Sequence, residues 1–220
     1  MAKKGKLYAV GVGPGDPELL TLKAVKMIKN ADVIAFPADG DKPGIAYTIA
    51  EKAVPEITTK AALPLSFPMS QSGFEKAHLE AINQIKSALD SGKSVAFLTL
   101  GDPGFYSTFS YLYESFLQNS YEVDIICGVP SFCAASAKLR VPLAQGKASA
   151  IISAGEYHSF DGTQVIMKAG ARLGELKKAV KDSDRSAFLI ENCGMADERS
   201  YYDIDSFPDK TGYFSLMIVK

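Results

Sequence analysis

The fold is decided by one stretch, LYAVGVGPGDPELLTLKAVKMIKNADVIAFP, which runs from Leu7 to Pro37. Its apolar residues 7–10 predict a strand that is buried on both faces. The backbone can then turn sharply and approach a ligand at three glycines, Gly11, Gly13 and Gly15. With the helix and second strand that follow, this is the opening unit of an α/β sheet.

The helix of this unit is expected to begin directly after the glycine turn. Asp16 can accept hydrogen bonds from the free N–H groups of the helix, and Pro17 suits the first helical position. One apolar face follows at helical spacing, made of Leu20, Ala24, Met27 and Ile28. The second strand is predicted at 33–36, and Pro37 is expected to end it.

A glycine-rich turn between a strand and a helix favours a nucleotide site, but these residues argue against phosphates. The dinucleotide fingerprint needs its third glycine three residues after the second, where this chain has Asp16. A carboxylate there would repel a pyrophosphate. Phe36 and Pro37 stand where the ribose-binding acid is expected, and no Gly-Lys-Ser/Thr of a P-loop follows. The turn should admit a compact ligand without phosphates, unless its glycines serve packing alone.

Composition and charge limit the classes of protein to which the chain can belong. The 220 residues, 47% hydrophobic and 22% charged, suit a soluble globular chain with one large domain or two of about 100 residues. A net charge of −1 gives no support to a nucleic-acid or anionic-membrane partner. No apolar run of about 20 residues is present, and we expect neither a signal peptide nor a membrane helix. Three cysteines without metal-ligand spacing and two histidines indicate no metal site, and a cytoplasmic protein with reduced thiols is expected.

The pattern of apolar run, glycine turn and helix recurs through the first half of the chain. The predicted elements there are helix 45–54, strand 58–65, helix 74–91, strand 94–100, helix 106–117, strand 123–127 and helix 132–139. Because the carboxyl ends of parallel strands meet at one edge, we expect a parallel sheet whose glycine turns gather there.

Shorter elements predict a smaller α/β domain with a mixed sheet after Val141. Its predicted elements are strands 148–154, 163–168, 186–191 and 213–219 and helix 173–180. The expected domains are 1–128 and 129–220, with a ligand cleft between them that loops from both would line.

Asp102 is the most informative carboxylate, because it lies where strand 94–100 meets a helix, beside two glycines. It either shapes the turn alone, or joins neighbouring backbone groups in binding the polar edge of a ligand. Hydroxyls of the first helical turn could assist, from Tyr106, Ser107 and Thr108. The segment Phe67-Pro68-Met69 likewise either lines an apolar pocket or plugs the core.

Five segments taken together, GVGPGDPELLTLKA, FLTLGDPGFYSTF, ICGVPSF, IMKAG and FLIENCG, resemble the tetrapyrrole (corrin/porphyrin) methyltransferase family in order and spacing. The resemblance covers nearly the whole chain. Phe67-Pro68-Met69 and DPGFYSTFSYL resemble the C20 branch, the precorrin-2 and cobalt-factor II C20-methyltransferases of cobalamin biosynthesis. The resemblance implies two α/β domains, S-adenosyl-L-methionine (SAM) as cofactor, a tetrapyrrole substrate and a homodimer.

The resemblance also implies which residues contact the ligands. Cofactor contacts are expected at Pro14, Leu100, Gly101, Asp102, Phe105, Pro130, Ser131, Met167 and Cys193. Cys193 stands where many relatives carry glycine, which leaves its role open. Substrate contacts are expected at Phe67, Met69, Tyr106, Lys42 and Arg140. Since the substrate carries many carboxylates, Lys60, Lys138 and Lys168 are further candidates, unless they are ordinary surface cations.

The expected reaction is attack of carbon 20 of the reduced macrocycle on the sulfonium methyl group of SAM. The protein then has to supply mainly orientation and exclusion of water. Relatives that methylate uroporphyrinogen carry an aspartate at the position of Pro37, so that base is not carried over to this chain. The catalytic base is left unassigned, with Tyr106, Asp39 and Asp41 as weak candidates.

Other functions remain open at this stage. Metal-free precorrin-2 could replace the cobalt substrate. Within the same fold, a ribosomal-RNA methyltransferase would be expected to show a basic face, and a diphthamide-pathway methyltransferase would act on a protein side chain. A non-enzymatic carrier would bind SAM or a tetrapyrrole without turnover, and a phosphate-binding module would be protected by nucleotides instead of SAM.

Overall fold

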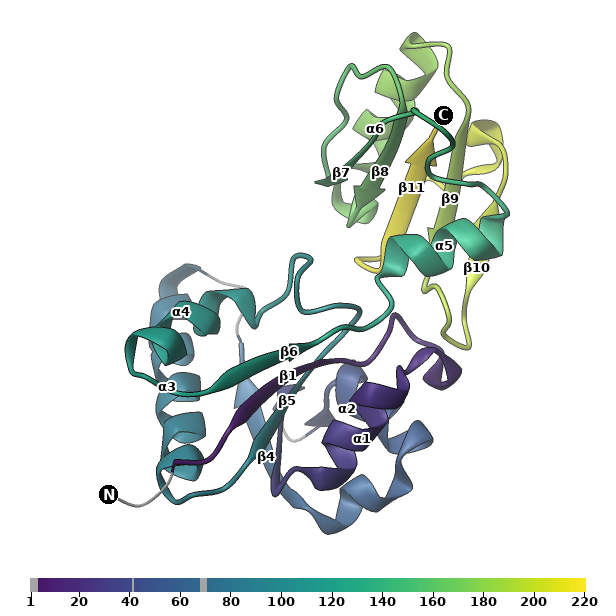
Figure 1. Cartoon of the computed structure of the whole chain (residues 1–220). Helices are drawn as coiled ribbons and strands as arrows, with labels where there is room; N and C mark the ends of the chain where they lie inside the picture. The colour runs from purple at the N-terminus through teal and green to yellow at the C-terminus, as the bar shows by residue number, and fades with distance from the viewer. Residues whose placement is uncertain (1–3, 41, 68–70) are drawn as a thin grey trace. The chain divides into compact units, whose positions relative to one another are not determined.

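The computed structural model describes residues 4–40, 42–67 and 71–220, without the side chains at 39, 71, 72 and 74. The chain divides into two compact units, Met1–Pro130 and Ser131–Lys220, each built around its own sheet (Figure 1). The predicted domain boundary after residue 128 stays a prediction.

The first unit contains five parallel strands in the spatial order β4-β2-β5-β1-β6. Their bounds are β1 Leu7–Gly11, β2 Val33–Asp39, β4 Ala61–Ser66, β5 Val95–Thr99 and β6 Val123–Ile126. A two-residue strand, β3 Lys42–Pro43, pairs antiparallel with the end of β2. Leu7 pairs with both Val95 and Val123, so the carboxyl ends of β1, β5 and β6 meet at one edge, as predicted.

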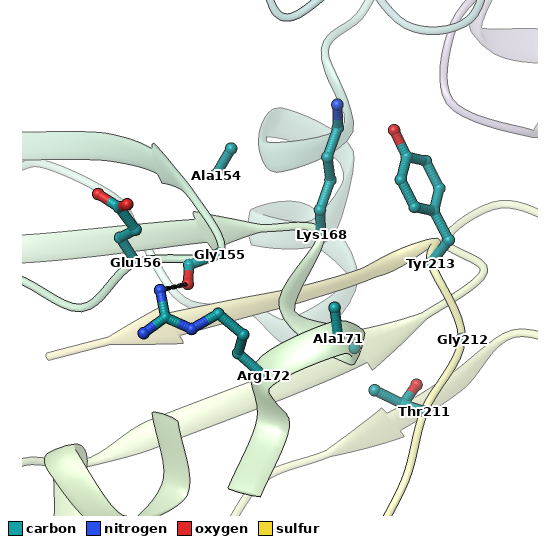
Figure 2. A pocket seen from close by; sticks show the side chains of 10 residues that line it. Ala154, Gly155, Glu156, Lys168, Ala171, Arg172, Thr211, Gly212 and Tyr213 are labelled. Atoms are coloured by element: carbon teal, nitrogen blue, oxygen red, sulfur yellow. Dashed lines mark hydrogen bonds between the residues drawn. The ribbon is translucent and has the colours of Figure 1, made fainter. Parts of the chain in front are cut away.

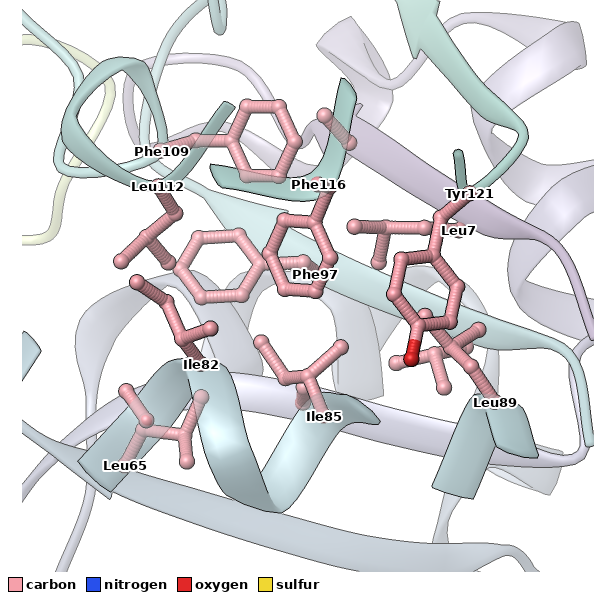
Figure 3. Packing of buried hydrophobic residues seen from close by; sticks show 14 of the residues in the cluster. Leu7, Leu65, Ile82, Ile85, Leu89, Phe97, Phe109, Leu112, Phe116 and Tyr121 are labelled. Atoms are coloured by element: carbon pink, nitrogen blue, oxygen red, sulfur yellow. The ribbon is translucent and has the colours of Figure 1, made fainter. Parts of the chain in front are cut away.

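Helices cover both faces of this sheet. Their bounds are α1 Leu22–Asn30, α2 Ile45–Ala53, α3 Gln71–Asp90 and α4 Ser110–Gln118. Residues of α1 and α2 pack with Val10 and Leu98 on one face, and residues of α3 and α4 pack with Leu7 and Phe97 on the other. Figure 3 shows the second cluster, where side chains of α3 point toward the ring of Phe97. Each large apolar side chain that is fully buried there contributes about 1.5–3 kcal/mol.

The first helix begins later than predicted. Asp16 does accept a backbone hydrogen bond, from Glu18 N, but it caps only the short 3-10 helix η1, Pro17–Leu19. The cap of α1 is Thr21, whose hydroxyl accepts from Ala24 N at 3.1 Å.

The prediction that Pro37 ends the second strand is also wrong, because β2 continues to Asp39. The ladder between β2 and β5 stops at Ala35, so the missing N–H of Pro37 removes no hydrogen bond from it.

Other element boundaries also differ from the prediction, most informatively those of the third strand and the fourth helix. The third strand was expected from residue 58, but residues Pro55–Thr59 form the 3-10 helix η2 and β4 starts at Ala61. The helix expected from Tyr106 starts at Ser110, because Tyr106 adopts a positive φ of 47° that a helix cannot contain.

The second unit has a mixed sheet, as predicted, and its five strands lie in the order β10-β9-β11-β8-β7. Its elements are α5 Ser131–Leu139, β7 Ala150–Ala154, β8 Thr163–Met167, η3 Ala169–Arg172, α6 Leu173–Asp182, β9 Ala187–Glu191, β10 Arg199–Tyr201, η4 Ile204–Ser206 and β11 Ser215–Val219. Only β7 and β8 pair in parallel. Helix α5 contacts β9 and β11, whereas α6 packs on a cluster with Ile166 and Met217. The sequence missed β10, which is too short to show a period.

Within the described part of the chain, no helix has both the length and the apolar character that a bilayer crossing requires.

Candidate functional site

Four glycines close the edge where β1, β5 and β6 end. A Cβ atom on Gly128 would lie 2.1 Å from the carbonyl oxygen of Gly101, and one on Gly11 would lie 2.6 Å from the same oxygen. Gly13 and Gly101, both at positive φ, donate backbone hydrogen bonds to each other at 3.2 and 2.8 Å. Close packing of the chain therefore explains Gly11 and Gly128 without a ligand.

The carboxylate of Asp102 joins two of these turns. One oxygen accepts from Gly104 N at 2.7 Å, and the other accepts from Gly128 N at 3.0 Å. Asp102 thus shapes its own turn and fixes the end of β6. Each carboxylate oxygen can accept more than one hydrogen bond, and the residue is only partly buried, so a ligand donor can still reach it.

The first glycine turn suits a ligand without phosphates. The carboxylate of Asp16 binds the N–H of Glu18 at 2.9 Å, so a negative charge already occupies the start of η1. Thr21, besides capping α1, donates to the carbonyl of Cys127 at 3.2 Å and so links α1 to the end of β6. Pro14, an expected cofactor contact, is buried in this turn.

The loop after Asp102 presents two aromatic side chains. Phe105 and Tyr106 are 42% and 50% exposed, and the positive φ of Tyr106 is a conformation that non-glycine residues seldom adopt. Ser107 does not offer its hydroxyl to a ligand as expected. It is buried, lies 2.9 Å from the hydroxyl of Thr99, and accepts from Phe109 N at 3.0 Å.

Phe67 packs on the core of the first unit. Its ring centroid lies 6.2 Å from that of Phe97 and 5.2 Å from that of His78. These contacts place the ring of Phe67 against the core, and the rest of the segment, Pro68 and Met69, lies outside the described residues. Met69 and Asp41 lie outside the described residues, and so does the side chain of Asp39.

The candidate cations differ in their surroundings. Lys60 donates to the carbonyl of Ala31 at 2.7 Å, which gives it a structural role. Lys138 lies 3.7 Å from the carboxylate of Glu198. Two others are exposed, Lys42 on β3 and Arg140 after α5.

Two expected cofactor contacts of the second unit, Met167 and Cys193, lie at one edge of its sheet. Met167 ends β8 and Cys193 follows β9, and both strands flank β11. Burial, with a contribution from the charge of Glu198, raises the pKa of the Cys193 thiol to about 11. Cys193 is thus protonated at neutral pH and is no nucleophile. The other two cysteines, Cys127 and Cys133, are exposed.

A pocket of about 500 Å³ opens at this same edge (Figure 2). The lining residues come from the ends of β7 and β8, from η3, and from the segment that enters β11: Ala154, Gly155, Glu156, Lys168, Gly170, Ala171, Arg172, Thr211, Gly212 and Tyr213. Lys168 was a candidate from its charge, but Tyr213 and Thr211 were missed. No local signal marks them, because only the pairing of β8 with β11 brings them to Lys168.

Among the residues that the structure describes, no group of three or more histidine, cysteine, aspartate or glutamate side chains is arranged to hold a metal ion.

Curated relatives match the chain over its whole length. It is 32% identical to the cobalt-precorrin-2 C(20)-methyltransferase of Salmonella typhimurium, over 98% of this chain and 96% of the relative. It is 30% identical to the precorrin-2 C(20)-methyltransferase of a Sinorhizobium species, over 98% and 95%. The cobalamin biosynthesis protein CobIJ of Mycobacterium tuberculosis is 32% identical over 100% of this chain, which spans only 46% of that protein.

A solved structure and a family model agree with these relatives. The uroporphyrin-III C-methyltransferase of Thermus thermophilus, complexed with S-adenosylhomocysteine, has a TM-score of 0.73 at 20% identity, over 98% of this chain and 97% of its own. That likeness shows the fold. The model of the Tetrapyrrole (Corrin/Porphyrin) Methylases matches residues 6–204. The chain therefore belongs to the tetrapyrrole (corrin/porphyrin) methylase family.

Proposed function

We propose that this chain transfers a methyl group from SAM to carbon 20 of cobalt-factor II (cobalt-precorrin-2) in cobalamin biosynthesis. The observation that carries the proposal is the relative from Salmonella, which matches in length as well as in sequence and whose name states this reaction.

Metal-free precorrin-2 is the second candidate substrate. The relative from Sinorhizobium supports it at a similar identity, and its name states the same carbon without cobalt. A ribosomal-RNA or diphthamide substrate has no comparable support.

The residues of the first glycine turn fit SAM as the cofactor. SAM carries no phosphate, so the carboxylate of Asp16 at the start of η1 has no pyrophosphate to repel. Asp102 has acceptor capacity left for the ammonium group of the cofactor. The S-adenosylhomocysteine of the Thermus structure is further support. We propose the expected contacts unchanged: Pro14, Leu100, Gly101, Asp102, Phe105, Pro130, Ser131, Met167 and Cys193.

The chemistry requires little acid–base work from the protein. SAM supplies a methyl group that its positive sulfur already activates, and the chain has to orient the macrocycle and keep water out. Phe105 and Tyr106 are suited to contact and orient the macrocycle, since both side chains are exposed. Their loop is held in place where it ends, because the hydroxyl of Ser107 accepts a hydrogen bond from Phe109 N. The base that takes the proton from carbon 20 is left unassigned, with Tyr106, Asp39 and Asp41 as candidates and water as the alternative. A homodimer and a cytoplasmic location are part of the proposal, by analogy with the family.

Single-turnover mass spectrometry tests this function. The protein and SAM are mixed with cobalt-factor II or with metal-free precorrin-2, and NMR locates any methyl group gained. Gain of one methyl group at carbon 20 of cobalt-factor II is the expected result. A gain with precorrin-2 alone would transfer the assignment to that substrate. If SAM binds and neither macrocycle is methylated, the C20 assignment is refuted.

A further inference from the structure

A pair of buried hydroxyl groups joins the end of β5 to the loop of residues 100–109. The Oγ1 atom of Thr99, the last residue of β5, lies 2.9 Å from the Oγ atom of Ser107. Both residues are buried, at 5% and 4% exposure. Because a buried hydroxyl that loses its partner is costly, this pair fixes position 107 to the end of the strand.

Ser107 is bonded to the start of α4 as well. Its Oγ atom accepts from Phe109 N at 3.0 Å, and its carbonyl oxygen accepts from Ser110 N at 3.2 Å. Phe109 is buried in the core of the first unit, where its ring centroid lies 5.4 Å from that of Phe97 (Figure 3). The loop therefore ends at a point that is tied both to a strand and to a helix packed on the core.

The first half of the loop has its own fixed point, Asp102. Its carboxylate accepts from Gly104 N at 2.7 Å and from Gly128 N at 3.0 Å. Its carbonyl oxygen accepts from Phe105 N at 3.2 Å, which closes a turn over residues 102–105. Phe105 is therefore held from the side of Asp102.

Tyr106 lies between the two fixed points in a conformation that needs support. Its φ of 47° falls in the left-handed region, which a non-glycine residue adopts only where the surrounding contacts impose it. Half of its side chain is nevertheless exposed, at the edge where β5 ends. The chain thus maintains an unfavourable backbone angle at a ring that is open to solvent, and such strain is characteristic of positions that contact a ligand.

We propose that Thr99 and Ser107 are positioning residues, which hold Tyr106 in the left-handed conformation in which its ring contacts the macrocycle. This inference rests on the proposed function, which supplies the macrocycle. Without the hydroxyl pair, Tyr106 would move to more favourable backbone angles, and only the fraction of molecules that keeps the strained conformation would bind. The apparent affinity would fall in proportion to that fraction.

The first test measures the mobility of residue 106. The chain contains no tryptophan, so Tyr106→Trp introduces a single one, whose fluorescence anisotropy reports the motion of that side chain. Thr99→Val removes the hydroxyl and keeps the shape, whereas Thr99→Ser keeps the hydroxyl. The matched control is Tyr202→Trp, at an exposed tyrosine of the second unit. We expect Thr99→Val to lower the anisotropy of Tyr106→Trp and not that of Tyr202→Trp, and Thr99→Ser to lower neither.

The second test measures macrocycle binding without turnover, by the change in absorbance of cobalt-factor II or of metal-free precorrin-2, with SAM absent. Thr99→Val and Ser107→Ala should each weaken binding about 3- to 10-fold, the equivalent of one hydrogen bond. Thr99→Ser should stay within about twofold of wild type, since its hydroxyl is kept. The SAM dissociation constant should change by less than about twofold in all three, because Asp102 is held independently. The melting temperature of each variant is measured alongside.

A combined variant separates positioning from a merely structural role. Tyr106→Asn removes the ring but supplies a residue that tolerates a positive φ, and it should weaken macrocycle binding about tenfold. Addition of Thr99→Val to Tyr106→Asn should cause no further loss of binding, because the hydroxyl pair then has no ring to hold in place. With a merely structural role, Thr99→Val would weaken binding by the same factor in both backgrounds.

Unchanged anisotropy of Tyr106→Trp on addition of Thr99→Val, or unchanged macrocycle affinity of Thr99→Val, would overturn the inference and leave the proposed function intact. A loss of SAM affinity as large as the loss of macrocycle affinity would also overturn it, because the pair would then support the cofactor site. If the variants behave as expected but wild type transfers no methyl group, the inference stands and the proposed function falls. If wild type binds neither macrocycle, both are refuted.

Discussion

Substitution of Gly128 by alanine should destabilise the first unit strongly. The added Cβ atom would lie 2.1 Å from the carbonyl oxygen of Gly101 and 2.8 Å from the backbone of Gly11. Both neighbours are backbone atoms at the ends of paired strands, so no side-chain rotation relieves the overlap. The strand ends have to separate, which also strains the hydrogen bond from Gly128 N to Asp102.

The expected loss follows from the cost of overpacking. Insertion of one extra carbon into a well-packed region costs about 1–3 kcal/mol, and contact with backbone places this site at about 3 kcal/mol. At about 2–4 °C per kcal/mol for a chain of this size, the melting temperature should fall by about 6–12 °C. The assay is thermal unfolding followed by circular dichroism.

The matched control makes the same chemical change where space is open. A Cβ atom on Gly174, in the first turn of α6, would meet no atom within 4 Å. Gly174→Ala should therefore raise stability by up to about 1 kcal/mol, through helix propensity alone. Unchanged melting of Gly128→Ala, or an equal fall in Gly174→Ala, would refute the reasoning from strand-end packing.

Three further predictions concern a thiol, a carboxylate and the core. In the native protein at pH 8, a thiol reagent should modify the two exposed cysteines and leave Cys193 unmodified, because the pKa of the Cys193 thiol is raised to about 11. Mass spectrometry that showed three rapid adducts would contradict this. Hydrogen bonds from Ser94 lower the pKa of the Asp32 carboxyl in the folded protein. The stability that these bonds give is therefore fully present above about pH 4, the usual aspartate pKa. It is lost as the pH falls through the lower pKa of the folded state. Asp32→Asn should accordingly melt below wild type at pH 7 and approach it in acid, and a difference that grew in acid would disprove the assignment. Phe97→Ala should lower the free energy of unfolding by about 3–5 kcal/mol in a urea titration, since the ring is fully buried among aromatic neighbours; a loss below about 1 kcal/mol would show that the core refills the space.

The sequence predicted the elements well wherever the periodic pattern of apolar residues extended over a whole strand or helix. It failed where two local signals competed. Asp16 and Thr21 are both good helix caps, and the chain uses the second for α1 because its hydroxyl also reaches Cys127, which is remote in sequence. Likewise Tyr106 adopts a positive φ and Ser107 contacts Thr99 in the preceding strand, so α4 begins only at Ser110.

The candidate site was predictable to a similar extent. The glycine turns and Asp102 are visible in the sequence because each follows an apolar run. Their mutual contacts are not, since the Gly101–Gly128 approach depends on the order of the strands in the sheet. The pair of Lys168 and Tyr213 requires the antiparallel register of β8 and β11, which no local pattern encodes.

The glycine contacts at the ends of β1, β5 and β6 divide this edge into a part that tolerates redesign and a part that does not. Any side chain at position 11 or 128 collides with backbone, so variation there should be lost from a library selected for folded protein. Phe105 and Tyr106 lie on the loop at the same edge and are about half exposed, at 42% and 50%. Variation at this edge without loss of the fold is therefore expected at positions 105 and 106, and not at positions 11 and 128.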